Sequence, residues 1–168
     1  DENDKDCPPG TAGEIVGRGR IAMPFYHNRP DATREASWID ETGAVWLRTG
    51  DIGQLDEDGF LYIVDRKKDM IVSGGQNIYP KDIETVLIEH AAIADVAVIG
   101  IPDARWGETP LAVIVAANGE APDADALVEW ANAKLGKQQR LHRARLIDEL
   151  PRNANGKVLK RELRARFG

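Results

Sequence analysis

The feature that most constrains this chain is a pair of almost unbroken apolar runs, DVAVIGI at 95–101 and LAVIVAA at 111–117. A strand with one solvated face alternates apolar and polar residues, whereas a strand covered on both faces reads as a continuous apolar run. We therefore expect two buried strands with other elements packed on both of their faces. The surrounding sequence indicates what those elements are.

Helical patterns lie close to both apolar runs. Pro80 suits the first turn of a helix, where its missing N–H costs no hydrogen bond. A second helix can begin at a cap formed by Asp123 or Asp125. In both segments the residues of one face recur at the helical spacing of i, i+3, i+4 and i+7. The expected stripes are Ile83, Val86, Leu87 and His90 in the first helix, and Leu127, Trp130, Ala131 and Lys134 in the second.

The N-terminal part follows a different pattern. Residues 10–64 contain β-rich runs separated by Pro, Gly and acidic turns, and we expect no helix among them. The pattern changes at the charged connector DRKK, residues 65–68, after which strands and helices alternate. The sequence thus predicts two parts, 1–64 and 65–168, and an α+β fold in which only the second part has an ample core. The remaining expected elements are strands at 13–19, 44–48, 60–64, 70–73 and 144–148, a tight turn at Asn155-Gly156, and a helix at 160–167.

Composition argues against several classes of function. Cys7 is the only cysteine and the three histidines lie far apart, so neither a disulfide framework nor a zinc site is expected. No apolar run approaches the roughly 20 residues that span a bilayer. The acidic, Pro-rich N-terminus is unlike a signal or transit peptide. We expect a cytoplasmic protein with no transmembrane segment and no metal site of its own.

Charge is distributed unevenly along the chain. Residues 134–168 hold 11 Lys and Arg against 3 Asp and Glu, a local charge of +8, while residues 1–133 carry −14. A basic segment suits a polyanionic partner, although a solvated basic face on a terminal helix explains it equally well. Nucleic acid is not expected, because the segment lacks interleaved aromatic residues for base stacking. A phosphate-rich small ligand suits the same field.

Three short motifs carry side chains suited to nucleotide chemistry. In RTGD, Asp51 stands on a turn after a β-rich run, where a carboxylate can accept two hydrogen bonds from a ribose diol. In DRKKDMIVSGGQNIYP, Arg66 offers a fork of donors, and Gly74-Gly75 let backbone approach a narrow ligand. In PRNANGK, Lys157 follows a tight turn, and its ammonium can neutralise charge developing on a carboxylate or phosphate.

Trp106 and the basic cluster at 137–145 can bracket an adenine and its phosphates, by stacking and by charge. Each signal also has a commoner explanation. Asp51 and the glycine pair can be ordinary turn residues, Trp106 can be a core anchor, and Lys157 can be a plain exposed lysine. No single motif establishes a function, but their order along the chain is informative.

Taken in order, the motifs resemble the adenylate-forming superfamily over about residues 10–164. This superfamily includes acyl-CoA synthetases, aryl-CoA ligases and peptide-synthetase adenylation domains. The resemblance implies that a carboxylic acid is activated by ATP as an acyl-AMP and then transferred to a thiol, usually that of coenzyme A. The motifs are GTAGEIVGRG, WLRTGD, DGFLYIVDRKKDMIVSGGQNIYPKDIE, IPDARWGE and DELPRNANGK.

The resemblance also implies a domain organisation. Residues 65–168 correspond to a mobile C-terminal α+β lid of small sheets flanked by helices. Residues 1–64 correspond to a short all-β remnant of a large N-terminal domain. No run like the superfamily's STSGTTGxPKG phosphate loop or its YGxTE motif is present. We therefore expect the C-terminal part of a longer acyl-CoA synthetase, which by itself makes no acyl-AMP.

Site roles are implied position by position. The segment Gln138–His142 lacks the aromatic and the Pro of the superfamily's usual run, so the resemblance gives no support for its rigidity. The implied Mg²⁺ would be bound mainly by the missing N-terminal part. The implied residues are Lys157 for adenylation, Asp51 and Arg66 for the ATP or AMP ribose, Gly74, Gly75, Trp106 and Arg140 for coenzyme A, and Lys68 as the hinge within 65–68.

The expected substrates are ATP, coenzyme A and a carboxylic acid; fatty and aryl acids both remain open, and the resemblance favours a fatty acid. The missing N-terminal domain is the expected partner. Two alternatives remain open: an adenylation domain that loads a carrier protein, and a non-catalytic module that binds coenzyme A or a nucleotide.

Overall fold

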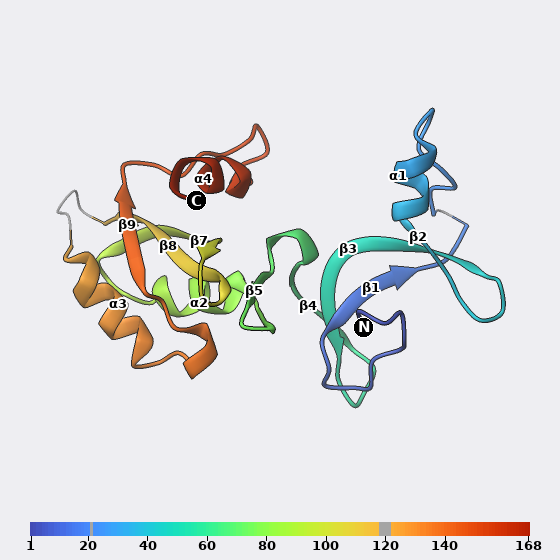
Figure 1. The fold of residues 1–168 in the computed structure, drawn as a ribbon, viewed down its shortest axis with the longest axis horizontal. Helices are drawn as coiled ribbons and strands as arrows, with labels where there is room; N and C mark the ends of the chain where they lie inside the picture. Colours follow the sequence, from blue (N-terminus) through green and yellow to red (C-terminus); the bar gives the residue numbers. More distant parts are fainter. Residues whose placement is uncertain (21, 118–121) are drawn as a thin grey trace. The chain divides into compact units, whose positions relative to one another are not determined.

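The computed structural model describes residues 1–20, 22–117 and 122–168, which form two compact units, Asp1–Lys68 and Asp69–Gly168. Each unit contains a β-sheet of its own (Figure 1). The fold class is α+β, as the sequence predicts. A one-turn 3-10 helix, η1 (Lys67–Asp69), spans the boundary between the units.

The first unit is a four-stranded antiparallel sheet built around its longest strand. This strand, β3, pairs with each of the other three. Across the β2–β3 pair, the rings of Trp38 and Trp46 lie 6.2 Å apart between centroids. The strands are β1 (Gly13–Gly17), β2 (Ser37–Ile39), β3 (Val45–Leu55) and β4 (Leu61–Arg66).

The expectation that residues 10–64 contain no helix is wrong. Helix α1 (Pro30–Glu35) begins with a proline in its first turn and has Asp31 near its N-terminus, both favourable at that end of a helix. None of its residues is buried. A helix that buries no face shows no apolar stripe, and a search for helical periodicity therefore overlooks it.

The first unit has little core of its own. Among its described apolar side chains only Ile52 is buried. The edge strand β4 presents a row of large apolar side chains to solvent, with Ile63 71% exposed. Most of the exposed large apolar residues of the described chain lie in this unit. They are Met23, Phe25, Tyr26, Ile39, Val45, Leu55, Phe60, Leu61, Tyr62 and Ile63.

The second unit contains a five-stranded sheet centred on β8. Strands β7 and β8 form a long antiparallel pair, and β9 runs parallel to β8 on its other side. A short hairpin of β5 and β6 joins the sheet through the pairing of Ser73 with Gly107. The strands are β5 (Ile71–Ser73), β6 (Gln76–Ile78), β7 (Ile93–Asp103), β8 (Gly107–Ala116) and β9 (Arg143–Ile147).

Both faces of this sheet are covered, which confirms the prediction made from the two apolar runs. Helices α2 (Pro80–Leu87) and α3 (Ala124–Asn132) pack on one face, and α4 (Lys160–Phe167) packs on the other (Figure 1). Alternate residues of β7 and β8 belong to the two cores. Val98, Ala112 and Ile114 face α2 and α3, while Ile99, Leu111 and Val113 face α4.

The helix limits agree with the predicted signals, except that the last residue of each predicted stripe lies beyond its helix. Pro80 stands in the first turn of α2, and Asp123 rather than Asp125 caps α3 by accepting two backbone N–H groups. Helix α3 ends at Asn132 and helix α2 ends at Leu87, so Lys134 and His90 lie beyond the helices predicted to contain them. The imidazole of His90 instead packs edge-on against Trp130 of α3, with 4.7 Å between ring centroids.

Candidate active site

Asp51 and Arg66 form a pair across strands β3 and β4. They are direct register partners, and Arg66 Nε lies 2.7 Å from Asp51 Oδ1. The register shifts beside them, between Ile52 and Gly53, and such a bulge redirects neighbouring side chains. The Arg66 side chain is 45% exposed and that of Asp51 is 27% exposed. The structure thus brings together the two residues assigned to a ribose, within reach of a ligand.

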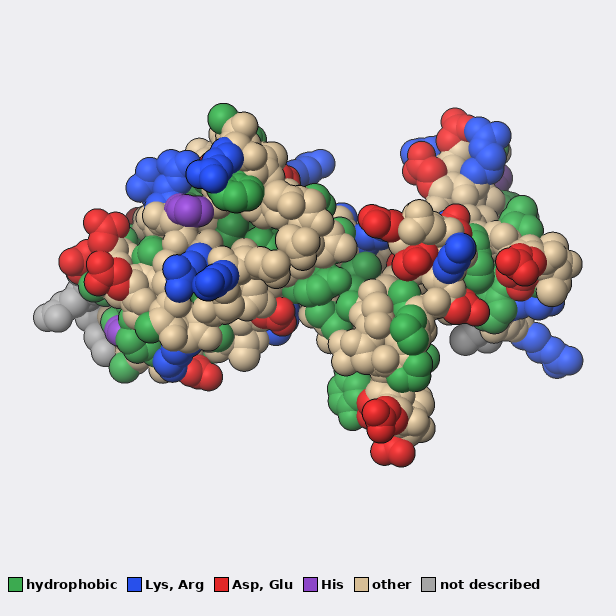
Figure 2. Space-filling view, turned by 60° about the horizontal axis from the view of Figure 1, so that its bottom comes forward, with side chains coloured by type: hydrophobic (Ala, Val, Ile, Leu, Met, Phe, Trp, Pro, Cys, Tyr) green, Lys and Arg blue, Asp and Glu red, His purple; other side chains and the backbone are tan. Residues whose placement is uncertain are grey.

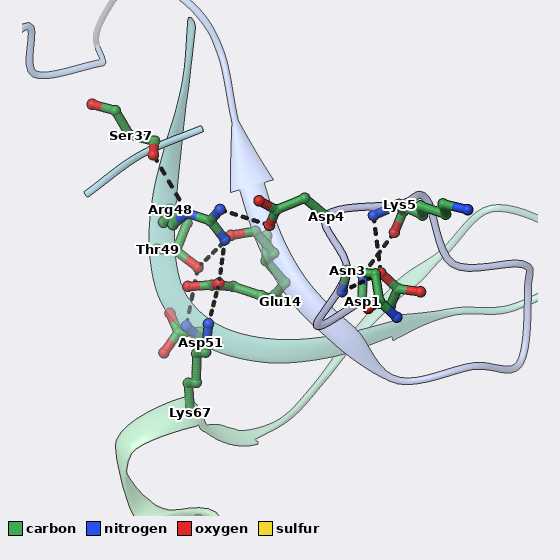
Figure 3. A network of polar contacts seen from close by, with 11 residues as sticks. Asp1, Asn3, Asp4, Lys5, Glu14, Ser37, Arg48, Thr49, Asp51 and Lys67 are labelled. Atoms are coloured by element: carbon green, nitrogen blue, oxygen red, sulfur yellow. Dashed lines mark hydrogen bonds and ion pairs between the residues drawn. The ribbon is translucent and has the colours of Figure 1, made fainter. Parts of the chain in front are cut away.

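A second polar network in the first unit converges on Glu14 (Figure 3). Its Oε2 atom accepts hydrogen bonds from Arg48 Nη1 at 3.0 Å and from Lys67 Nζ at 2.8 Å. Burial raises the pKa of Glu14, but the hydrogen bonds from Lys67 and Arg48 outweigh it and keep the pKa below its usual value. The network fixes Lys67, the residue that precedes the predicted hinge.

Lys68 itself is exposed, and none of the described residues pairs with it. Its neighbours on both sides are held. Lys67 is bound to Glu14 of the first unit, and Asp69 is buried and accepts a hydrogen bond from Arg164 Nη2 at 3.0 Å. Along the chain, the last ion pair of the first unit is therefore made by Lys67 and the first ion pair of the second unit by Asp69, with Lys68 between them.

The second unit has a groove of about 350 Å³ next to the β5–β6 hairpin. Three residues predicted to bind coenzyme A, Gly74, Trp106 and Arg140, line it together. Lys137 adds positive charge to the same groove, His142 also lines it, and both lie within the predicted basic cluster. The full lining comprises Ser73, Gly74, Gln76, Trp106, Thr109, Pro110, Lys137, Gln138, Arg140 and His142.

Trp106 is a surface platform rather than the core anchor that was the simpler alternative, because 42% of its surface is exposed. Its backbone is fixed at both ends. Asp103 Oδ1 accepts its N–H at 2.8 Å, and its carbonyl accepts the N–H of Gly74 at 2.8 Å. The backbone N–H groups of Trp106 and Arg105 lower the pKa of Asp103. The Arg105 guanidinium lies 4.6 Å from the centre of the indole.

Gly74 is required for this platform. Both Gly74 and Gly75 have positive φ, 56° and 78°, as a two-residue hairpin turn between β5 and β6 requires. A Cβ atom on Gly74 would lie 2.8 Å from Cε3 of Trp106, whereas one on Gly75 would have nothing within 4 Å. Gly75 does not line the groove. The sequence predicts the same role for Gly74 and Gly75, but the structure gives them different surroundings.

The segment around Arg140 is anchored without the proline of the superfamily's run. Residues Lys137–Gln139 form a single 3-10 turn, η2, and Leu141 is buried. Asn132 of α3 binds Leu141 twice, through Nδ2 to its carbonyl at 2.8 Å and through Oδ1 to its N–H at 2.9 Å. Side-chain hydrogen bonds thus hold the backbone next to Arg140.

Lys157 lies at the tip of a hairpin that precedes α4. Its side chain is exposed, and across the ranges that the structure describes its ammonium has no partner. The backbone of the tip is ordered by Asn153, whose Oδ1 accepts the N–H groups of Asn155 at 3.0 Å and Lys157 at 2.9 Å. Lys157 does not line the groove around Trp106. The second unit therefore carries two separate candidate surfaces.

The two units also differ in the charge of their exposed side chains. On the face shown in Figure 2, Lys and Arg side chains gather over the second unit, and acidic side chains are prominent on the first. Within residues 1–20, 22–117 and 122–168, no three His, Cys, Asp or Glu side chains are grouped as a metal site requires. No helix in these ranges is long and apolar enough to cross a bilayer.

Comparison with known proteins identifies the family. Residues 82–157 match the AMP-binding enzyme C-terminal domain. The 2-succinylbenzoate–CoA ligase of Bacillus cereus (strain ATCC 10987) is 48% identical over 157 residues, which cover 94% of this chain and 31% of that ligase. This chain contains the AMP-binding enzyme C-terminal domain of the adenylate-forming enzymes to which it is similar. It spans about a third of the length of the curated relatives that it matches.

Solved structures of this superfamily share the fold. ATP-bound MatB from Rhodopseudomonas palustris has a TM-score of 0.87 at 33% identity, over 97% of this chain and 32% of MatB. The fatty acyl CoA synthetase of Mycobacterium tuberculosis has a TM-score of 0.63 at 44% identity, over 93% of this chain and 30% of the synthetase. The adenylate-forming enzymes similar to this chain thus include ligases for an aromatic acid and for fatty acids.

Proposed function

We propose that this chain is the C-terminal part of an ATP-dependent carboxylic acid–CoA ligase. The observation that carries the proposal is the pair of surfaces on the second unit: the free Lys157 ammonium on an ordered hairpin, and the cationic groove beside Trp106. Formation of an acyl-AMP brings a carboxylate against the α-phosphate, and a positioned cation offsets the repulsion. Lys157 is the proposed cation.

The groove is the proposed site for the nucleotide end of coenzyme A. An exposed indole offers a stacking surface for a purine, and Lys137 and Arg140 offer charge to phosphates. Gly74 belongs to this site because only a residue without a Cβ leaves room for the indole. Gly75 is proposed to border the path of the thiol arm, where its open surroundings leave space.

Asp51 and Arg66 are the proposed contacts of the ATP or AMP ribose. The carboxylate of Asp51 has oxygen lone pairs to accept from two hydroxyls, and Arg66 already holds it in place. Any Mg²⁺ that accompanies ATP is proposed to be held mainly by the N-terminal domain.

Lys68 is the proposed hinge about which residues 69–168 move as a lid, because residues 65 and 66 of the expected lid belong to β4 of the first unit. The unit boundary falls directly after Lys68, and Lys67 and Asp69 are tied to opposite units. Rotation at a few backbone positions between rigid bodies is a common form of domain movement. It would allow Lys157 and the groove to serve consecutive half-reactions.

The proposed partner of the first unit is the large N-terminal domain of the same enzyme. The unit buries a single described apolar side chain and exposes ten large ones. Exposed apolar surface of this extent is typical of an interface. Domain contact would cover Ile63 of β4, which is 71% exposed, and Phe60 just before this strand, which is 67% exposed.

Two classes of acid are proposed as substrates to test. A fatty acid follows from the sequence resemblance and from the similar synthetase of M. tuberculosis. An aromatic acid such as 2-succinylbenzoate follows from the B. cereus ligase. Because none of the residues proposed here lines the pocket for the acyl chain, the choice is made by assay. Pyrophosphate release by the complete enzyme is compared with each acid.

The deciding experiment compares the complete enzyme, its Lys157→Ala variant and residues 1–168 alone. We expect pyrophosphate release by the complete enzyme, none by residues 1–168, and a loss of about 100-fold or more in the variant. Arg161→Ala, which removes an exposed cation with no described partner, is the control. Undiminished pyrophosphate release by Lys157→Ala would overturn the proposal.

A further inference from the structure

We propose that Arg152 is a positioning residue for Lys157, and that it acts by fixing the peptide group from which the lysine side chain extends. The inference rests on the proposed role of Lys157 in acyl-AMP formation and adds a second residue to that site. Arg152 itself contacts neither substrate nor the Lys157 ammonium. Its contacts are with the hairpin backbone and with the sheet.

Both polar groups of the Gly156–Lys157 peptide are held by side chains. Arg152 Nη1 donates to the Gly156 carbonyl at 2.6 Å, and Asn153 Oδ1 accepts the Lys157 N–H at 2.9 Å. Gly156 has a φ of 78°, a conformation that few other residues adopt without strain. The plane of this peptide sets the direction of the Lys157 Cα–Cβ bond. Holding the plane therefore aims the side chain.

The same guanidinium ties the hairpin to the sheet. Arg152 Nη2 lies 2.5 Å from Asp95 Oδ2, across 57 residues of sequence. Asp95 stands in β7 at a register shift between Ile93 and Asp95, and a bulge of this kind redirects a strand side chain. One planar group thus connects a fixed point on β7 to the turn beside Lys157. Lysine, with a single ammonium, could not reproduce this forked contact.

A second ion pair holds the far end of the hairpin. Lys160 Nζ lies 2.7 Å from Glu84 Oε1, and both side chains are only 14% exposed. The same oxygen accepts the N–H of Val98 in β7. Residues 152–160 are therefore fastened to the folded unit at both ends. Between these points the Lys157 ammonium keeps only the freedom of its own side chain.

This arrangement has a consequence for the reaction. A cation that must meet two anions at one place contributes most when its position is established before the substrates arrive. Release of the Gly156 carbonyl would let the peptide plane rotate and spread the ammonium over many positions. The loss should appear in acyl-AMP formation, which uses Lys157, and not in thioester formation from acyl-AMP already made.

The test uses the complete enzyme with Arg152→Gln, Arg152→Lys, Lys157→Ala and the control Arg161→Gln, whose exposed side chain has no partner in the described ranges. For Arg152→Gln we expect kcat of acyl-AMP formation to fall about 10- to 100-fold with KM for ATP little changed. Arg152→Lys should give an intermediate loss. Thioester formation from purified acyl-AMP should match the unmodified enzyme and the control.

A second measurement, amide hydrogen exchange, does not depend on catalysis. Amide hydrogen exchange at Lys157 should accelerate in Arg152→Gln and stay unchanged in Arg161→Gln. Where Arg152→Gln does not fold, Asp95→Asn keeps the contact to Gly156, weakens the anchor, and should give a smaller loss of the same kind. Equal losses in both half-reactions would overturn the inference, because they would indicate a general structural role.

Failure of the inference is distinguishable from failure of the proposed function. If Lys157→Ala abolishes acyl-AMP formation while Arg152→Gln leaves it intact, the positioning role is wrong and the ligase function stands. If Lys157→Ala keeps acyl-AMP formation, the proposed function is wrong whatever Arg152→Gln does. Unchanged exchange at the Lys157 amide in Arg152→Gln would also refute the positioning role.

Discussion

Gly74→Ala and Gly75→Ala should destabilise the second unit by different amounts. Both residues have positive φ, so each alanine incurs a backbone strain of about 1–2 kcal/mol. Only at Gly74 does the new Cβ meet Trp106, at 2.8 Å from Cε3 and 3.1 Å from Cζ3, well inside the usual 3.5–4.0 Å carbon contact. Overpacking adds about 1–3 kcal/mol. We expect a loss of about 2–5 kcal/mol for Gly74→Ala.

The indole can relieve the clash by turning towards solvent, because it is already 42% exposed. That movement would remove one wall of the groove. In the complete enzyme we therefore expect Gly74→Ala to raise KM for coenzyme A in thioester formation and to leave acyl-AMP formation unchanged. Gly75→Ala should affect both less, because no atom lies within 4 Å of its Cβ position.

The assay is urea unfolding followed by far-UV circular dichroism, performed on both single variants and repeated in a Trp106→Ala background. Without the indole, Gly74→Ala should cost only the backbone strain, and the two alanine variants should become equal. Equal losses for the two variants with Trp106 in place would refute the reasoning. An unchanged difference after removal of Trp106 would refute it as well.

Two further predictions concern stability. Glu84→Ala leaves Lys160 unpaired and the Val98 N–H without its side-chain acceptor, so urea unfolding should show a loss of about 2–4 kcal/mol. The exposed Glu129→Ala serves as its control, and similar losses in both would contradict the argument. The Thr42 hydroxyl, the Trp46 indole N–H and the Ala44 N–H lower the pKa of Asp40 below its ordinary 3.8. Because the pKa of Asp40 is lower in the folded than in the unfolded state, its carboxylate stabilises the folded state above pH 3.8. This stabilisation is lost progressively as the pH falls below 3.8. The stability difference between the protein and Asp40→Asn, measured by urea unfolding at several pH values, should therefore shrink below pH 3.8, and a difference independent of pH would count against the argument.

The sheet of the second unit could be predicted because strands buried on both faces appear in the sequence as continuous apolar runs. The runs at 95–101 and 111–117 became β7 and β8, with α4 on one face and α2 and α3 on the other. Elements without a buried face show no apolar pattern by which they could be predicted. Helix α1 is solvent-exposed, and β6, with only three residues, lies between a glycine turn and Pro80.

The site residues were predictable as residue types but not as contacts. The pairing of Asp51 with Arg66 depends on the β3–β4 register, which a bulge shifts next to Asp51. The sequence indicated only a tight turn before Lys157, whereas the structure also fastens that hairpin through Arg152 and Lys160. These contacts reach across 57 residues or more. Sequence patterns over short windows cannot indicate such pairings.

The contrast between the two units bears on how a lid could work. A body that presents Lys157 and then the Trp106 groove, as proposed, must keep both surfaces intact while it moves. The second unit can do so because its sheet is covered on both faces by helices of the same unit. The first unit exposes its apolar residues, and the proposed N-terminal domain would cover them. The difference in burial thus favours the second unit as the moving body, with flexibility confined to the residues around Lys68, where the ion pairs of each unit end.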